Sequence, residues 1–298
     1  MIPVRKLLGI ILVLLAVTAG CVRSNSEGEE MQFETADRTS GFNQITYSSG
    51  DISPGRRIEV RAVIQNNNVV PAENVELEIM NIAPLQLEGE SQGPFTESQG
   101  VRTCSFESLG PASETSGGDI RSCRWTLTCP ENSQCSRTAE NFESYDVPIR
   151  IGLSYETEIT NPEDSIEVEF LSLEDMTGRQ TSEKTYMAEN GDLRLEAVYE
   201  SPEPVDEDSL EIEMSLTDTG EGNLDSQGIN IEYVGPFSNY LEDQSSCDTL
   251  IIPEGESSVS NSCLMALKDI EAGNIYQMRL RGRYKYSKTE NIQLKITS

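Results

Sequence analysis

The sequence predicts an all-β protein built from two tandem antiparallel β-sandwiches of immunoglobulin-like architecture. Short runs in which apolar and polar residues alternate recur along most of the chain, and this is the period of a half-buried strand. Gly, Pro, Asn and Asp separate the runs, and amphipathic helical patterns are absent. A series of these runs occurs twice in the same order. Because each strand has one apolar face, two sheets must stack to bury it.

The length of 298 residues is enough for two domains with cores of their own. We place a signal peptide at 1–21, a flexible acidic tether at 22–40, a first sandwich at 41–187 and a second at 188–298. A short connection around Ala188–Gly191 is expected to join the two sandwiches.

The N-terminus has the features of an export signal. Arg5 begins a short basic stretch, and the apolar run 7–17 that follows is too short for a membrane-spanning helix, which needs about 20 residues. The next residues, VTAGC, end at Cys21 and resemble a lipobox, with Thr18 where that motif usually has Leu. The resemblance implies cleavage before Cys21 and lipidation of its thiol. The alternative is an ordinary signal peptide followed by an incidental cysteine.

The charge balance is strongly acidic, with 51 acidic residues, 22 basic residues and a net charge of −29. Such a field repels nucleic-acid phosphates and disfavours lying flat on an anionic membrane. Only six of the cations are Lys. An acid-rich, Lys-poor surface suits concentrated salt, where the Debye length falls to about 3 Å and self-repulsion is screened. We therefore expect a halophilic source; a generic acidic exported protein is the alternative.

The internal repeat is the most informative pattern in the chain. Residues 47–64 and 199–216 align without a gap, so that Tyr47 corresponds to Tyr199 and Val60 to Ile212. Further matches follow in the same order: 75–79 with 229–233, Phe95 with Phe237, Cys104 with Cys247, Cys123 with Cys263, Tyr155 with Tyr284, and the last strands 166–170 with 292–296. We interpret the series as a duplicated module of about seven strands.

Six cysteines remain besides Cys21, an even number in an exported chain, which favours disulfides. Two of them fall in the second module and can pair only with each other there. The predicted bonds are Cys247–Cys263 and, by the repeat, Cys104–Cys123, with Cys129–Cys135 left as an extra pair.

The spacing between Cys123 and Cys129 supports part of this assignment independently. Trp125 and Leu127 lie between them at every second position, as on one face of a strand. Six residues of strand span about 20 Å, whereas a disulfide needs Cα atoms within about 7 Å, so these two cannot pair if this is one strand. A four-cysteine zinc site is the alternative, but its usual close pairs of cysteines are missing. We expect no metal site.

Catalytic patterns are not found in the sequence. It has no His, which removes Ser–His and Cys–His mechanisms, and neither a Ser-x-x-Lys arrangement nor a phosphate-binding loop occurs. Most carboxylates alternate with apolar residues, as Glu76 and Glu78 do, and indicate a solvated sheet face. The acidic loops 206–208 and 218–225 lack the calcium-loop spacing and are interpreted as turns. We therefore predict no enzyme activity, no catalytic residues and no cofactor.

Residues 54–79 read PGRRIEVRAVIQN and then, from Ala72, AENVELEI. They resemble the CARDB-type immunoglobulin-like modules of archaeal and bacterial surface proteins. Asn67 stands where that family tends to have Gly, and the second module has Asp206 where the first has Pro54. The resemblance implies a seven-stranded adhesion or spacer module and brings no catalytic residues. Disulfides are not part of the family's usual pattern.

Together these features predict a non-catalytic lipoprotein on the extracellular face of the cell membrane. It would present two disulfide-stapled sandwiches for adhesion, with an envelope protein or a glycan as the partner and no nucleic acid. The alternative is an accessory subunit of an envelope assembly, such as a pilus or secretion complex. An exposed apolar patch or open sheet edge would favour the subunit. Phe95 and Phe237 are candidates for such a patch, although core positions are the preferred interpretation.

Overall fold

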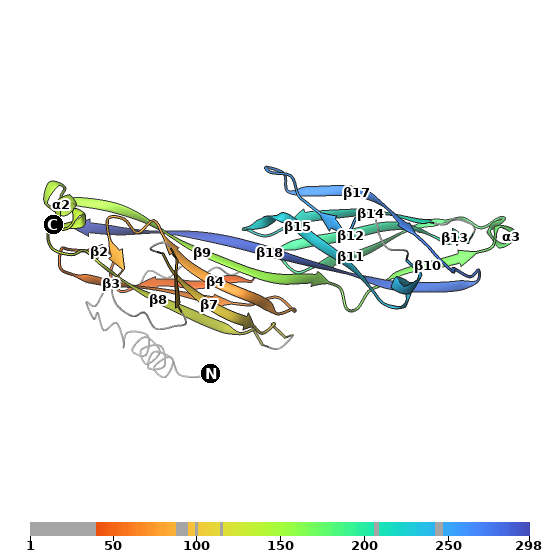
Figure 1. The fold of residues 1–298 in the computed structure, drawn as a ribbon, viewed down its shortest axis with the longest axis horizontal. Coiled ribbons are helices and arrows are strands. Elements are labelled where there is room, and N and C mark those ends of the chain that lie inside the picture. Colours follow the sequence, from red (N-terminus) through yellow and green to blue (C-terminus); the bar gives the residue numbers. More distant parts are fainter. Residues whose placement is uncertain (1–39, 88–94, 99–100, 114–115, 206–208, 242–246) are drawn as a thin grey trace, which may run out of the picture.

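The computed structural model describes residues 40–87, 95–98, 101–113, 116–205, 209–241 and 247–298. The signal peptide, nearly all of the tether and the acidic loop 206–208 lie outside these residues. The described chain is all-β, as predicted, and forms an elongated molecule with two lobes arranged end to end (Figure 1). Among the described helices none is long and apolar enough to cross a membrane.

Eighteen strands and three short helices make up the described chain. They are, in order, β1 (Gly41–Tyr47), β2 (Asp51–Ile52), β3 (Arg57–Gln65), β4 (Ala72–Met80), β5 (Gln86–Leu87), β6 (Phe95–Ser98), β7 (Val101–Leu109), β8 (Ile120–Thr128), α2 (Gln134–Asn141), β9 (Ser144–Thr160), β10 (Ile166–Leu171), α3 (Leu173–Met176), β11 (Ser182–Glu189), β12 (Leu193–Ser201), β13 (Glu203–Pro204), β14 (Ser209–Asp218), β15 (Asn223–Val234), the 3₁₀ helix η1 (Pro236–Tyr240), β16 (Thr249–Leu250), β17 (Ser258–Ala266) and β18 (Asn274–Thr297).

Each lobe has one four-stranded antiparallel sheet, ordered β1-β3-β8-β5 in one lobe and β11-β12-β14-β17 in the other. The strands that share a pattern in the sequence occupy equivalent places. Tyr47 pairs with Val60 between β1 and β3, and its counterpart Tyr199 pairs with Ile212 between β12 and β14. The register of the first hairpin is therefore repeated in the second, as expected for a duplicated module.

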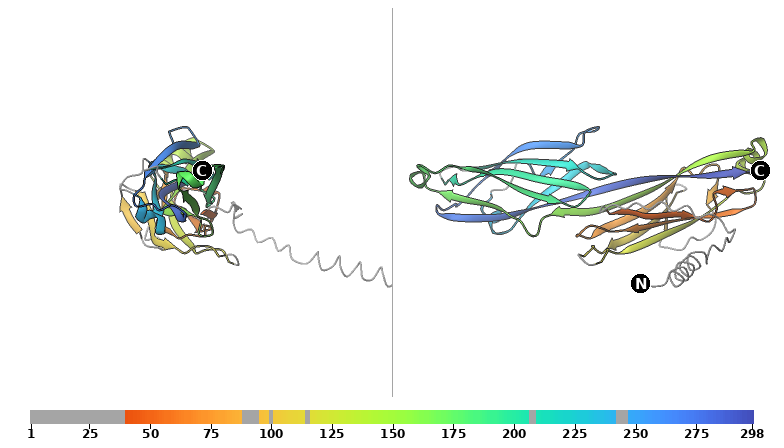
Figure 2. Two further views of the ribbon diagram at one scale, coloured as in Figure 1. Left: turned by 90° about the vertical axis from the view of Figure 1, so that its right-hand side faces the viewer. Right: turned by 180° about the vertical axis from the view of Figure 1, so that it is seen from behind.

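The second layer of both lobes is a single ten-stranded sheet, because β9 and β18 pair with each other. These two long antiparallel strands join Ser144–Thr160 to Arg281–Thr297 without a break, and they run through both lobes (Figures 1 and 2). After β9, the chain continues into β10, which pairs with the beginning of β18. The end of β18 in turn pairs with β9. Each copy of the repeat thus places its last strand in the lobe built by the other copy.

This exchange corrects the expected domain boundaries. The first lobe contains residues 40–160 and 287–297, and the second contains 166–286. The boundary at 187/188 falls inside β11, and Asn190 and Gly191 form a hairpin turn between β11 and β12 rather than a linker. Alternation of apolar and polar residues shows that a segment is a strand but not which sheet it joins. The two last strands are equivalent and each would fit either lobe. The repeat therefore does not show which lobe each strand joins.

The hydrophobic core reflects the exchange. Phe170 of β10 is buried against Phe237 and Tyr276 in the second lobe, with ring centroids 6.0 and 5.6 Å away. Leu294 of β18 is buried in the first lobe and pairs with Val147. At the crossing, Gly282 leaves room for its neighbours: a Cβ there would lie 2.1 Å from the side chain of Ile229, closer than real contacts allow.

We predict that Leu294→Ala destabilises the first lobe, although Leu294 belongs to the second copy of the repeat. Loss of a buried leucine side chain should lower the free energy of unfolding by about 2–5 kcal/mol. Hydrogen exchange followed by mass spectrometry should show that the substitution speeds exchange more in β9 and β3 than in β12 and β14.

The matched control is Gln293→Ala, which changes the exposed neighbour and should alter stability by no more than about 0.5 kcal/mol. Equal loss of protection in both lobes would show that the end of β18 does not belong to the first lobe in particular.

Candidate functional site

The six cysteines of the two lobes form three disulfides, in the pairs that the sequence predicts. Cys104–Cys123 joins β7 to β8, and Cys247–Cys263 joins the segment before β16 to β17, so each bond links the two sheets of one lobe. Cys129–Cys135 fixes α2 to the end of β8. Cys21 lies outside the described residues.

The other residues singled out from the sequence are structural where they are described. Phe237 is buried, so it belongs to the core and not to an exposed patch. The side chain of Phe95 lies outside the described residues. The acidic segment 218–225 contains the end of β14, the turn 219–222 and the start of β15. Within the part of the chain that is described, no three carboxylates or cysteines gather as a metal site would require.

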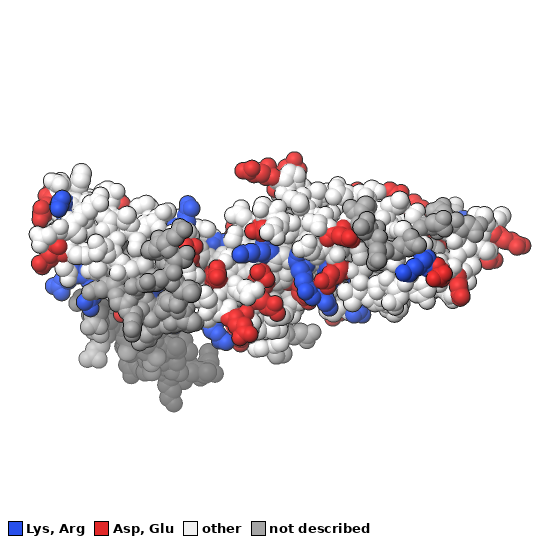
Figure 3. All heavy atoms as spheres, viewed as in Figure 1, with Lys and Arg blue, Asp and Glu red and all other residues white. Residues whose placement is uncertain are grey.

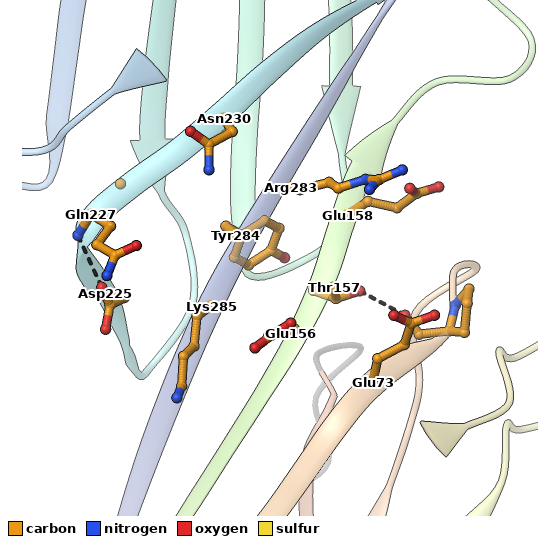
Figure 4. A pocket seen from close by; sticks show the side chains of 12 residues that line it. Glu73, Glu156, Thr157, Glu158, Asp225, Gln227, Asn230, Arg283, Tyr284 and Lys285 are labelled. Carbon is orange, nitrogen blue, oxygen red and sulfur yellow. Dashed lines mark hydrogen bonds between the residues drawn. The ribbon is translucent and has the colours of Figure 1, made fainter. Parts of the chain in front are cut away.

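A groove of about 640 Å³ lies along the β9–β18 ladder where the two lobes meet, and both exposed and buried residues of the ladder line it. Four strands line it, and the lining residues come from both lobes (Figure 4). The polar lining residues are Glu73 of β4, Glu156 and Glu158 of β9, Asp225, Gln227 and Asn230 of β15, and Arg283 and Lys285 of β18.

The groove carries charges of both signs. Glu73, Glu156 and Glu158 line it from the first lobe and Asp225 from β15, whereas β18 contributes Arg283 and Lys285. Basic and acidic side chains also gather near the middle of the molecule in the surface view (Figure 3). Lys285 is opposite Glu156 in the ladder, yet it forms no ion pair with any described residue. The groove therefore offers both cationic and anionic groups to a ligand.

A buried polar cluster lies in the core of the crossing, centred on the fully buried Asp192. Asp192 lies between the hairpin turn at Asn190 and Gly191 and the start of β12. Its Oδ2 accepts a hydrogen bond of 2.6 Å from the hydroxyl of Tyr155 and one of 3.4 Å from Nδ2 of Asn68, both in the first lobe. Its Oδ1 lies 3.5 Å from Nζ of Lys288, at the distance of an ion pair.

The environment of the cluster shifts its titration. Burial raises the pKa of the Asp192 carboxyl, although Lys288 and Tyr155 act in the opposite direction. Burial, with the nearby charge of Asp192, also raises the pKa of Tyr155 and Tyr284 well above the usual value, so both remain hydroxyl donors. The hydrogen bonds from Tyr155 and Asn68 to Asp192 connect the two lobes, and Tyr284 beside this carboxyl also lines the groove.

The groove offers both charged and uncharged hydrogen-bonding groups to a ligand. Its lining holds carboxylates, amides, two cations and Tyr284, but neither a cysteine nor a serine beside a base. The volume lies within the range of about 300–1,000 Å³ that small-ligand sites occupy. Sequence reasoning missed the groove because its residues come from four strands, and only the distribution of cations along β18 could have pointed to it.

No family model matches the chain, and no curated protein matches it. Among solved structures, a collagen adhesin from S. aureus is similar to it at 11% sequence identity, with 91% of this chain and 95% of that chain covered and a TM-score of 0.19. A TM-score this low means that the two backbones do not superpose as one arrangement, so nothing about the ligand follows from it.

Asp192 should make stability depend on pH. Its raised pKa means that the folded protein keeps a proton which the unfolded chain releases near pH 3.9. Its contribution to stability is therefore full below about that pH, falls as pH rises towards the folded pKa, and is then constant. We expect that the Asp192→Asn variant lacks this fall when the free energy of unfolding is measured with urea across a pH series.

Asp146→Asn, which changes an exposed acid of β9, is the matched control and should keep the fall. Lys288→Met completes a double-mutant cycle with Asp192→Asn, and the two changes should be non-additive by about 0.5–3 kcal/mol. Wild-type and Asp192→Asn curves that run parallel would show that the buried carboxyl does not couple to folding.

The three disulfides predict that the lobes contain no free thiol. Maleimide should label none of the six cysteines in denaturant without a reductant, and all six after reduction. Replacing both Cys247 and Cys263 by Ala should lower stability by about 3 kcal/mol, since the bond closes a loop of 16 residues. Labelling before reduction would contradict the assignment.

Proposed function

We propose that this protein is a non-catalytic, lipid-anchored surface protein that presents a rigid pair of β-sandwiches for adhesion. The export signal and the lipobox resemblance at Cys21 support the location. The CARDB-type resemblance at 54–79 and the disulfides support an extracellular module of this class. Its partner is a glycan or a protein of the cell envelope.

The observation that carries the proposal is the exchange of the last strands. Two sandwiches joined by a linker would move freely, whereas here a continuous ladder from Ser144 to Thr160 fixes them. Ser40, where the described chain begins, lies at the crossing, since its carbonyl accepts a hydrogen bond of 3.3 Å from Tyr155. The two lobes therefore extend in opposite directions from the point where the tether attaches. Such a rod suits the display of a binding surface.

One feature favours the second candidate function, an accessory subunit of an envelope assembly. β17 is at the end of its sheet, and no other described strand lies beside its outer edge from Ser258 to Ser262. The strand carries no charged residue and its register with β14 has no bulge. Natural edges are usually protected by charges, Pro or bulges, so this edge could accept a strand from another chain.

The location and the two functions can be tested on intact cells that express the full chain in their native salt. We expect protease to remove the lobes from the cell surface, and Cys21→Ser to abolish lipid labelling and release the protein into the medium. Cross-linking followed by mass spectrometry should recover the protein alone or with glycans.

The matched control for the anchor is Ser24→Ala, which lies close to Cys21 but outside the lipobox and should leave the lipid label in place. One protein partner in near-equal amount would instead make this chain an assembly subunit. Protection from protease on intact cells, together with free thiols, would contradict export and with it both functions.

A further inference from the structure

The outward face of β18 carries a row of cations. Arg279, Arg281, Arg283 and Lys285 alternate with the inward-facing Leu280, Gly282 and Tyr284. The chain has only 22 basic residues against 51 acidic ones, so four at consecutive outward positions are a marked local concentration. We call these four residues the basic track.

The basic track connects two hollows. Arg283 and Lys285 line the central groove at one end. At the other end, Ile275 and Gln277 of the same strand line a second hollow of about 530 Å³. Ten residues of strand separate Ile275 from Lys285, a length of about 34 Å. A surface of this shape suits a polymer that lies along β18 rather than a single small molecule.

The track is only partly neutralised by neighbouring carboxylates. Arg281 lies 3.6 Å from Glu158 and 3.9 Å from Glu232, and Arg283 lies 3.7 Å from Glu232. Arg279 and Lys285 form no ion pair with a described residue. Their charges are therefore available to anionic groups of a ligand, while the carboxylates beside them accept hydrogen bonds from hydroxyl groups.

This mixture of groups distinguishes among polyanions. Successive cations are two strand residues apart, about 7 Å, and carboxylates of the neighbouring strands β9 and β15 lie beside Arg281 and Arg283. Nucleic acids carry a denser charge, about one for every 1.7 Å of duplex, than cations at this spacing can match. An acidic polysaccharide has sparser anionic groups and many hydroxyls, and so matches both the cations and the carboxylates.

We propose that the basic track and the central groove bind an acidic polysaccharide of the uronic-acid type, held at its carboxylates by Lys285, Arg283 and Arg279. The inference rests on the proposed function, since it names the class of glycan that the surface protein would bind. Binding depends on ion pairs and therefore weakens as salt is raised, but it is retained in part because hydroxyl contacts are not screened.

The test uses the purified full chain with its three disulfides intact. Oligogalacturonate is titrated into the protein, and binding is measured by calorimetry. Lys285→Glu should weaken binding by about tenfold to a hundredfold, the effect of losing one charge-assisted hydrogen bond. Lys295→Glu is the matched control, because it makes the same charge change on the same exposed face of β18 but beyond the groove. It should leave affinity unchanged within about twofold.

Lys285→Gln, which adds no negative charge opposite Glu156, should weaken binding less than Lys285→Glu and should keep the thermal stability of the wild type. Lys285→Glu places like charges opposite each other in the ladder and should lower that stability slightly. Equal binding of a neutral maltooligosaccharide would overturn the role of the cations. Preferred binding of chitosan oligomers would assign recognition to the carboxylates, and preferred binding of single-stranded DNA would overturn the polysaccharide class. Absence of binding by every probe would overturn this inference and leave the surface location, which protease treatment tests, unaffected.

Discussion

The antiparallel ladder between β9 and β18 is the constraint on which the rest of the structure depends. Neither lobe has a complete second sheet without a strand from the other copy of the repeat. Most pairs of domains in one chain touch through modest, partly polar surfaces and move relative to each other. Here backbone hydrogen bonds run unbroken from one lobe to the other, so relative motion would require their loss. The rigid shape, the groove and the basic track all follow from this pairing.

The buried cluster at the crossing helps to fix the register of that ladder. A slip of one residue would turn Tyr155 and Lys288 away from the core, and the carboxyl of Asp192 would be left buried without partners. A buried charge that loses its partner is costly, although an intact buried pair adds little to stability compared with apolar packing. The main effect of the cluster is therefore to disfavour other registers of the ladder. Its contribution to the free energy of unfolding is small.

Local features of the sequence predicted much of the fold, while the features that depend on tertiary pairing were hidden. The alternation around Val60 and Ile212 located matching hairpins, and the even spacing of Cys123, Trp125 and Leu127 identified a buried strand face. The last strands, 166–170 and 292–296, were recognised as equivalents, and this equivalence is the reason that their exchange could not be read from the pattern. No pattern in the sequence singles out Asp192, because acidic residues are common beside turns. Only the structure shows that this one is buried.

The fusion of both copies in one chain also allows opposite charges to face each other at the centre of the ladder. Two separate copies of one module that swapped their last strands would form a symmetric dimer. At the centre of its ladder, each residue would face the same residue of the other subunit. Position 156 in the first repeat corresponds to 285 in the second, and the two side chains are paired in the ladder. In a symmetric dimer a glutamate there would face a glutamate, and the like charges would repel. Joining both copies in one chain removes that restriction, so that Glu156 can face Lys285 at the centre of the ladder.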